Sequence, residues 1–418
     1  MKSLGRKLAL VALASLAIYV LACRSSFSPD GSKILVTAAG GAYEQGHLLM
    51  YDRKAAKWTP LLSVGKSHGG DSVPIPTALW SADGKEVIAT WALDQHKAMV
   101  SVLPVGGTGP TRFLEVIAGG EESEDVPIIT IVPPVLRDHY LLFGGESLTV
   151  LDLKSGAVDR QELPGNDTTN SAKKAIWLVD QGKEVGYLMG SGETVEAGRL
   201  DLADLAHLRP VPRFQLNVPK KDGNPFLAVS ESGTRLALTS GDDDNQSLLI
   251  YRQSQLERSF PFGAATNQGI VLGNLVWSPD GKTLYAAGFK SLQPGPLANA
   301  LHAGYQALRA VGFNPTEPRP LDFQMFVCEI PLDGRPIRET PLFRMASAHN
   351  EGFRVCYQIA LSPDGKTIAA ADGFAENHRE SRRPNLALYL LDLSGSRRSV
   401  SRIPIPRALA DSVGLLPE

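Results

Sequence analysis

The sequence predicts an all-β fold, a seven-bladed β-propeller built from four-stranded blades. Three observations support this prediction. A tight-turn tetrapeptide, clearest at 278–281 as Ser-Pro-Asp-Gly, recurs along the chain. A short apolar run lies on each side of most copies. Successive copies are mostly separated by a similar length of chain, roughly 50 residues, which is the kind of period that propellers and solenoids show.

The tetrapeptide has the composition of a type I turn between two strands. Serine suits its first position, proline presets φ at the second, and glycine accepts a left-handed conformation at the fourth. The copies begin at positions 28, 81, 136, 179, 230, 278 and 362, so the last interval is much longer than the others. Seven units therefore fill residues 24–418, and we expect no second domain in that range.

Each unit is expected to contain four strands. In unit six the apolar runs 275–277 and 283–287 flank the turn, and elsewhere a third run such as 248–251 and a less apolar fourth segment such as 58–62 follow. Sheets of this size bury both faces only by stacking on neighbours, and a closed ring leaves no end unit exposed. This favours a propeller over an open array.

The composition is that of an ordinary globular protein. Hydrophobic residues make up 43% of the 418 residues and charged residues 21%, which excludes a disordered chain. The formal net charge is −2, so there is no basic field to attract nucleic acid. Cys328 and Cys356 are isolated in apolar runs; export would allow a disulfide between them, although free thiols are common in such runs.

Residues 1–23 have the pattern of an export signal. Lys2, Arg6 and Lys7 precede an apolar run from residue 8 to residue 22. The sequence Val-Leu-Ala-Cys that ends at Cys23 resembles a bacterial lipoprotein box, which implies lipidation of Cys23. The alternative is an uncleaved N-terminal membrane anchor, for which the run is short against the roughly 20 residues of a spanning helix. Both alternatives place residues 24–418 outside the cytoplasm, in the cell envelope.

The clearest repeat resembles a known family. Residues 277–282 read Trp-Ser-Pro-Asp-Gly-Lys, and residues 80–85 and 361–366 are close variants. This motif is similar to the WD-like repeats of TolB, a periplasmic β-propeller, and of its relatives. The resemblance implies a propeller fold much more than a function, because propellers include enzymes, binding modules and scaffolds. We see no signal for TolB's additional N-terminal domain, so a Tol-specific role is not expected.

The sixth unit contains a long insertion, at about 289–321, which accounts for the longer last interval. Within it Leu297, Leu301, Tyr305 and Leu308 recur at helical spacing, which predicts a short amphipathic helix over 297–311. The helix is either a flap packed on its own propeller or a lid that docks a partner. Loops that link blades, and loops between second and third strands, share one face of the disc. A basic cluster there, with Arg379, Arg382 and Arg383, is a further candidate for partner binding.

Two functions remain open. The first is a non-catalytic, membrane-anchored module that binds a protein or an envelope polymer through this loop-rich face. The alternative is an enzyme, a hydrolase or lyase, with an active site at the central funnel; its candidates are His349, Glu351 and Asp71. No metal or cofactor is expected, because the eight histidines are scattered without ligand spacing. Gly-Lys-Ser-His-Gly at 65–69 is not a nucleophile elbow, because glycine and prolines follow it instead of a helix.

Overall fold

The computed structural model describes 25–39, 45–65, 77–81, 83–93, 97–106, 111–117, 130–136, 139–144, 147–152, 155, 157–162, 175–179, 184–191, 194–201, 209–217, 226–230, 232, 234–241, 245–252, 255–263, 269–291, 310, 322–346, 359–372 and 387–413. Over most of 130–217 it describes the backbone alone. The export segment 1–23 lies outside these residues. No helix among the described residues is long and apolar enough to cross a membrane.

The described strands form seven four-stranded antiparallel sheets, each made of four consecutive strands. We call the sheets blades 1 to 7 in chain order. Blade 1 contains β1 (Ser25–Phe27), β2 (Lys33–Ala39), β3 (Gln45–Asp52) and β4 (Lys57–Gly65). Blade 2 contains β5 (Thr77–Trp80), β6 (Glu86–Ala92), β7 (Lys97–Pro104) and β8 (Arg112–Ile117). Blade 3 contains β9 (Thr130–Leu136), β10 (His139–Gly144), β11 (Ser147–Asp152) and β12 (Val158–Glu162).

The other four sheets repeat this order. Blade 4 contains β13 (Ala175–Val179), β14 (Glu184–Ser191), β15 (Thr194–Asp201) and β16 (Arg209–Asn217). Blade 5 contains β17 (Leu227–Val229), β18 (Arg235–Ser240), β19 (Ser247–Arg252) and β20 (Gln255–Pro261). Blade 6 contains β21 (Ile270–Trp277), β22 (Thr283–Ser291), β23 (Asp322–Pro331) and β24 (Arg338–Ala346). Blade 7 contains β25 (Ile359–Leu361), β26 (Thr367–Asp372), β27 (Ala387–Asp392) and β28 (Ser399–Pro404).

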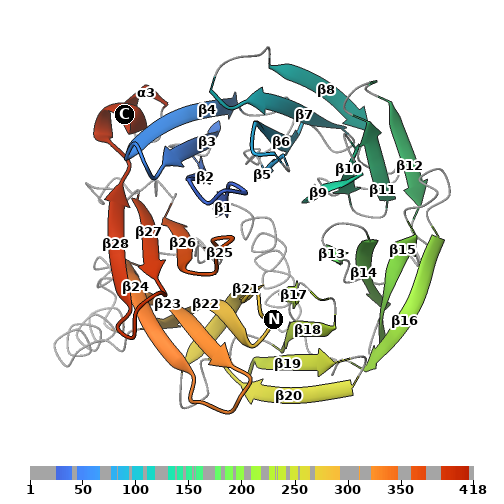
Figure 1. The fold of residues 1–418 in the computed structure, drawn as a ribbon, viewed down its shortest axis with the longest axis vertical. Helices are drawn as coiled ribbons and strands as arrows, with labels where there is room; N and C mark the ends of the chain where they lie inside the picture. Colours follow the sequence, from blue (N-terminus) through green and yellow to red (C-terminus); the bar gives the residue numbers. More distant parts are fainter. Residues whose placement is uncertain are drawn as a thin grey trace.

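The sheets are arranged around a common centre. In every sheet the first strand lies nearest the centre and the fourth lies on the outer rim (Figure 1). This arrangement is a β-propeller, as the repeat predicts. A short C-terminal helix, α3 (Arg407–Ser412), lies on the outer rim between β28 and β4 (Figure 1). No sequence pattern noted above predicts this helix.

The burial of each strand follows its place in the blade. The third strand β3 is buried from Gly46 to Tyr51, whereas the outer strand β20 has no buried residue. A middle strand packs on both faces against neighbouring blades and therefore consists of an almost continuous apolar run, as sheets covered on both faces do. The core therefore consists of apolar layers between blades.

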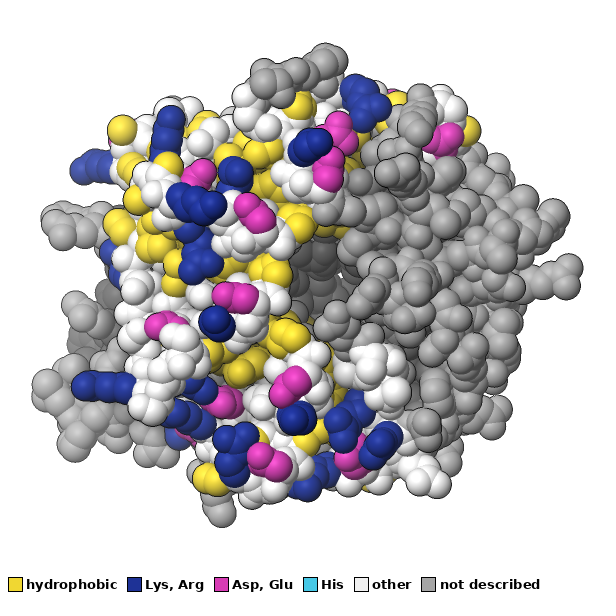
Figure 2. All heavy atoms as spheres, in the orientation of Figure 1, with side chains coloured by type: hydrophobic (Ala, Val, Ile, Leu, Met, Phe, Trp, Pro, Cys, Tyr) yellow, Lys and Arg dark blue, Asp and Glu magenta, His cyan; other side chains and the backbone are white. Residues whose placement is uncertain are grey.

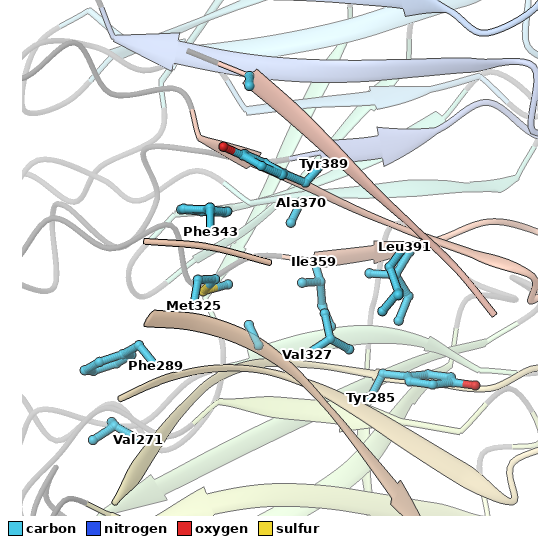
Figure 3. Packing of buried hydrophobic residues seen from close by; sticks show 13 residues of the cluster. Val271, Tyr285, Phe289, Met325, Val327, Phe343, Ile359, Ala370, Tyr389 and Leu391 are labelled. Carbon is cyan, nitrogen blue, oxygen red and sulfur yellow. The ribbon is translucent and has the colours of Figure 1, made fainter. Parts of the chain in front are cut away.

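The layer between blades 6 and 7 illustrates this packing. Phe343 and Tyr389 stack across it with ring centroids 4.5 Å apart. Met325 lies between Phe343 and Phe289, and Ile359 and Val327 continue the layer toward the opposite side (Figure 3). Stacked aromatic pairs contribute about 0.5–1.5 kcal/mol beyond the area that they bury. Side chains from both blades thus hold neighbouring sheets in contact.

Candidate functional site: the two faces of the propeller and the seams between blades

One face of the propeller is formed by the turns between the first and second strands, and we call it the turn face. In the predicted tetrapeptides the serine hydroxyl donates to the aspartate two residues later. The Oγ–Oδ1 distances are 2.6 Å for Ser28 and Asp30, 2.8 Å for Ser81 and Asp83, 2.7 Å for Ser278 and Asp280, and 2.6 Å for Ser362 and Asp364. In each turn the glycine N–H also donates to the serine carbonyl, at 2.8 or 2.9 Å. The predicted turn chemistry is therefore confirmed at these four positions.

The turn carboxylates are occupied by these hydrogen bonds. Asp280 accepts from the Ser278 hydroxyl and from the Lys282 N–H, and these bonds lower the pKa of its carboxyl. The hydroxyls of Ser28 and Ser32 lower the pKa of Asp30 in the same way, well below its usual range. Hydrogen bonding to the charged form favours it. These aspartates therefore serve to shape the turns, and they are poor candidates for catalytic acids.

Neighbouring turns touch one another around the centre. A Cβ added to Gly365 would lie 3.0 Å from Pro279 Cδ in blade 6, and one added to Gly84 would lie 3.3 Å from Pro29 Cδ in blade 1. The same contact joins the two ends of the chain, because a Cβ on Gly31 would lie 3.6 Å from Pro363 Cδ in blade 7. Positive φ favours glycine at all three positions, and the close approach of the neighbouring turn adds to this at Gly84 and Gly365.

Tryptophans at the end of two first strands connect adjacent blades. Trp277 Nε1 in blade 6 donates to the Ala228 carbonyl oxygen in blade 5 at 3.1 Å. Trp80 Nε1 in blade 2 donates to the Ser26 carbonyl oxygen in blade 1 at 3.2 Å. Both acceptors lie on innermost strands, whose free edges face the centre. Both acceptor residues are paired with the second strand of their own blade, Ser26 with Leu35 and Ala228 with Ala237, so each indole adds a bond from the following blade to an oxygen within a ladder.

Charged side chains also join neighbouring blades. Arg398 of blade 7 and Glu329 of blade 6 approach to 2.8 Å with side chains only 14% and 16% exposed. Arg235 of blade 5 pairs with Glu257 at 2.9 Å and donates to the Gly281 carbonyl oxygen of blade 6 at 3.0 Å. On the face that Figure 2 shows, basic and acidic side chains of the described residues are interspersed, with no large field of one sign.

The opposite face receives the longer connections, and we call it the long-loop face. Connections between second and third strands, and those from one blade to the next, begin and end there because the sheets are antiparallel. Residues 292–321 connect β22 to β23, and residues 373–386 connect β26 to β27. On the turn face no connection is longer than the one between β7 and β8, which comprises only 105–111. The two faces thus differ sharply in the length of chain that they display.

Buried amides form part of the support beneath the long-loop face. The Gln246 side chain of blade 5 donates to the Leu272 carbonyl oxygen at 3.0 Å and accepts from the Leu272 N–H at 2.6 Å. Gln324 donates to the Phe343 carbonyl oxygen at 2.8 Å. Both amides are buried. The sequence analysis did not single them out, because one glutamine beside an apolar run gives no signal for a contact between strands.

His47 is a buried histidine near the same end of blade 1. Its side chain is fully buried, and Nδ1 lies 2.9 Å from Ser63 Oγ. Burial lowers the pKa of the imidazole to about 4. His47 Nε2 and Thr90 Oγ1 are, among the described residues, the buried side-chain atoms without a hydrogen-bond partner. Sequence analysis did not select His47, because a single histidine in an apolar strand is usually a packed core residue.

The residues predicted to carry function lie outside the described residues. They are the candidate catalytic residues Asp71, His349 and Glu351, the helical positions Leu297, Leu301, Tyr305 and Leu308, the basic residues Arg379, Arg382 and Arg383, and the lipidation candidate Cys23. Of the predicted helical segment, Ala310 is described, and it is helical and exposed. The described part of the chain contains no group of three or more potential metal ligands.

Cys328 is a free thiol, fully buried in β23. Its side chain packs beside Gly288, where an added Cβ would lie 3.2 Å from the sulfur. Burial raises the pKa of this thiol far above its usual range. Cys328 is therefore an inert core residue in this structure, and Cys356 lies outside the described residues.

No protein-family model matches the chain, and no curated protein matches it. Solved structures that resemble it are distant. The β-propeller domain of Cps50 (Swd1) from Myceliophteria thermophila is 14% identical and covers 85% of this chain and 93% of its own, with a TM-score of 0.49. A putative 6-phosphogluconolactonase from Bacteroides uniformis is 16% identical and covers 89% of this chain and 95% of its own, also with a TM-score of 0.49.

The C-terminal WD40 domain of Sif2 is similar to the chain at the same level. It is 13% identical and covers 92% of this chain and 95% of its own, with a TM-score of 0.46. At such identities and TM-scores the likeness does not extend to function. The assignment of the fold rests on the arrangement of the sheets in this structure.

Proposed function

We propose that the chain is a seven-bladed, extracytoplasmic β-propeller of TolB-like type that is attached to a bacterial membrane through residues 1–23. In this proposal the seven described sheets are the complete set of blades. The propeller binds a protein or an envelope polymer through its long-loop face. The export pattern at the N-terminus supports the location, and the Trp-Ser-Pro-Asp-Gly-Lys repeat supports the type.

The difference between the two faces carries the proposal. Connections on the turn face are short, and the four described tetrapeptide turns are internally hydrogen-bonded, so their serine and aspartate side chains are already paired. The long-loop face instead receives connections as long as 292–321, all attached to rigid strands. Binding residues are found disproportionately on loops positioned by a rigid scaffold. Because the described turn face has neither clustered ligands nor acids poised for catalysis, recognition through the long-loop face is the function that this geometry supports best.

The test is binding by the full chain to partners isolated from the cell envelope and then purified. We compare the wild type with a variant lacking 297–312 and with the triple variant R379A/R382A/R383A. The matched control is K85A/K282A/K366A, which removes three charges from the turn face. We expect the two long-loop variants to weaken binding at least ~10-fold, the factor that corresponds to about 1.4 kcal/mol, and the control to leave it unchanged. Equal binding by all four proteins, or a loss confined to the control, contradicts the proposal.

The attachment is tested separately by fatty-acid labelling. If Cys23 is lipidated, the wild type incorporates the label and Cys23→Ala loses it. If residues 1–22 act as an uncleaved anchor, neither protein is labelled and both remain in the envelope fraction. A soluble, unlabelled wild type would exclude both forms of attachment.

A further inference from the structure

The seam between blade 7 and blade 1, where the ring closes, differs from the seams described between blades 1 and 2 and between blades 5 and 6. At those two seams Trp80 and Trp277 donate to a carbonyl oxygen of the preceding innermost strand. The equivalent position before Ser28 is Phe27, whose side chain has no N–H. The corresponding bond to Ala360 therefore cannot form, and the ring closes without this central connection.

His47 lies in the same seam. It stands opposite Ala38 in the β2–β3 ladder, so both side chains are on the same side of blade 1. Ala38 packs in one apolar cluster with Ala371 and Leu388 of blade 7. The imidazole is therefore buried on the side that faces blade 7. Its one hydrogen bond, to Ser63, is made within blade 1.

Among the described side chains, none close to His47 offers compensation for a positive charge. The side chains described around His47 are those of Ala38 and Ser63 and, across the seam, the apolar cluster of blade 7. The charged groups described at this seam, among them Arg53, Asp364, Asp392, Arg407 and Asp411, lie beyond the other end of β3 or on the rim. In the charged imidazolium both ring nitrogens carry an N–H, and Nε2 has no acceptor among the described residues. A buried, unpaired charge is strongly unfavourable.

The outer rim of the seam is held by the C-terminal segment. Trp58 Nε1 of blade 1 donates to the Pro404 carbonyl oxygen at 3.1 Å. Ile405 and Ala410 are buried in the same apolar cluster as Trp58. This rim contact would hold the outer edges of blades 1 and 7 together if the rest of the seam separated.

We propose that protonation of His47 opens the seam between blades 7 and 1 while the contacts between blades 5 and 6 stay closed. The contact between blades 7 and 1, which closes the ring, is then sensitive to acid. The opened seam exposes apolar surface from both blades, including Ala38 and Leu388. An acidic compartment or medium would thus change the shape of the ring without unfolding its blades.

The test is amide hydrogen exchange of the full chain at about pH 7 and about pH 4.5, corrected for intrinsic rates. With a pKa of about 4 in the closed seam and 6.5 in an open one, the protection of β1–β3 and β25–β27 should fall on the order of 50-fold. Protection of β18, β19, β21 and β22 should fall far less. His47→Gln, which keeps a polar partner for Ser63 but does not titrate, should show no such fall in blades 1 and 7.

Each result bears on the proposal. Unchanged protection of blades 1 and 7 in the wild type overturns it, as does an equal fall in His47→Gln. An equal loss in blades 5 and 6 also overturns it, because the whole ring would then respond. His47→Leu is a second non-titrating variant in case His47→Gln fails to fold at neutral pH. It should be less stable than the wild type at neutral pH but equally insensitive to acid.

Discussion

Trp277 donates its indole N–H to the carbonyl oxygen of Ala228, 3.1 Å away in the neighbouring blade. The tryptophan belongs to the repeat motif, and its acceptor lies two residues before the equivalent turn serine of the previous repeat. One motif therefore encodes both its own hairpin and a contact with the blade before it. This explains why a short repeat can specify a ring as well as a sheet.

Trp277→Phe should destabilise the protein by about 0.5–1.5 kcal/mol, because it removes the indole hydrogen bond that joins blades 5 and 6. The measurement is the free energy of unfolding by urea. Trp80→Phe should behave similarly, since Trp80 makes the same contact with Ser26. Phe113→Ala is the surface control, because Phe113 is 55% exposed, and it should change stability little. A Trp277→Phe protein as stable as wild type would refute the role of the indole bond.

The hairpin turns were predictable from sequence because their chemistry is local. Ser278 and Asp280 sit two residues apart, and the bond between them needs no distant partner. The contacts between blades were not predictable in this way, because the indole of Trp277 and the amide of Gln246 reach acceptors 49 and 26 residues away in the chain. The helix α3 was missed because it has six residues and no side-chain cap. The predicted functional residues lie on connections outside the described residues, so those predictions remain predictions.

The pair Arg398 and Glu329 should contribute measurably to the contact between blades 6 and 7. Glu329→Gln leaves a largely buried guanidinium without its carboxylate, and such a loss costs about 2–4 kcal/mol. A double-mutant cycle with Arg398→Met measures the coupling. The matched exposed pair is Lys97 and Glu115, whose side chains are 47% and 50% exposed. Its coupling should be below about 1 kcal/mol; similar values for both pairs would contradict the role of burial.

Gly365→Ala should destabilise more than Gly334→Ala. Both glycines have positive φ, +69° and +91°, so alanine is strained at either position by about 1 kcal/mol. Only at Gly365 would the new Cβ also meet a neighbouring turn, 3.0 Å from Pro279 Cδ, whereas no atom lies within 4 Å at Gly334. The measurement is the melting temperature of both variants and of Gly65→Ala, a position with open space and no positive φ. The difference between Gly365→Ala and Gly334→Ala gives the effect of the contact between turns. The prediction fails if Gly365→Ala melts at or above the temperature of Gly334→Ala.

The turn aspartates should make the propeller lose stability in strong acid. Hydrogen bonds hold the pKa values of Asp30, Asp83, Asp280 and Asp364 below the ordinary 3.8, so the folded state keeps these carboxylates ionised where the unfolded chain binds protons. Their contribution is therefore complete above about pH 4 and is lost progressively as the pH falls through the folded pKa values. Asp280→Asn should remove part of this dependence.

The measurement is urea unfolding of the wild type and Asp280→Asn at several values between about pH 2 and pH 5. The control is Asp411→Asn on the rim, where the carboxylate is 55% exposed and lies 3.9 Å from Arg407. It should leave the slope of stability against pH unchanged. If Asp280→Asn and Asp411→Asn lose stability with acid as steeply as the wild type, the hydrogen-bonded turns are not the origin of the acid sensitivity below pH 4. The loss ascribed to His47 begins at higher pH, as the pH falls below 6.5, so the two effects can be told apart in one titration.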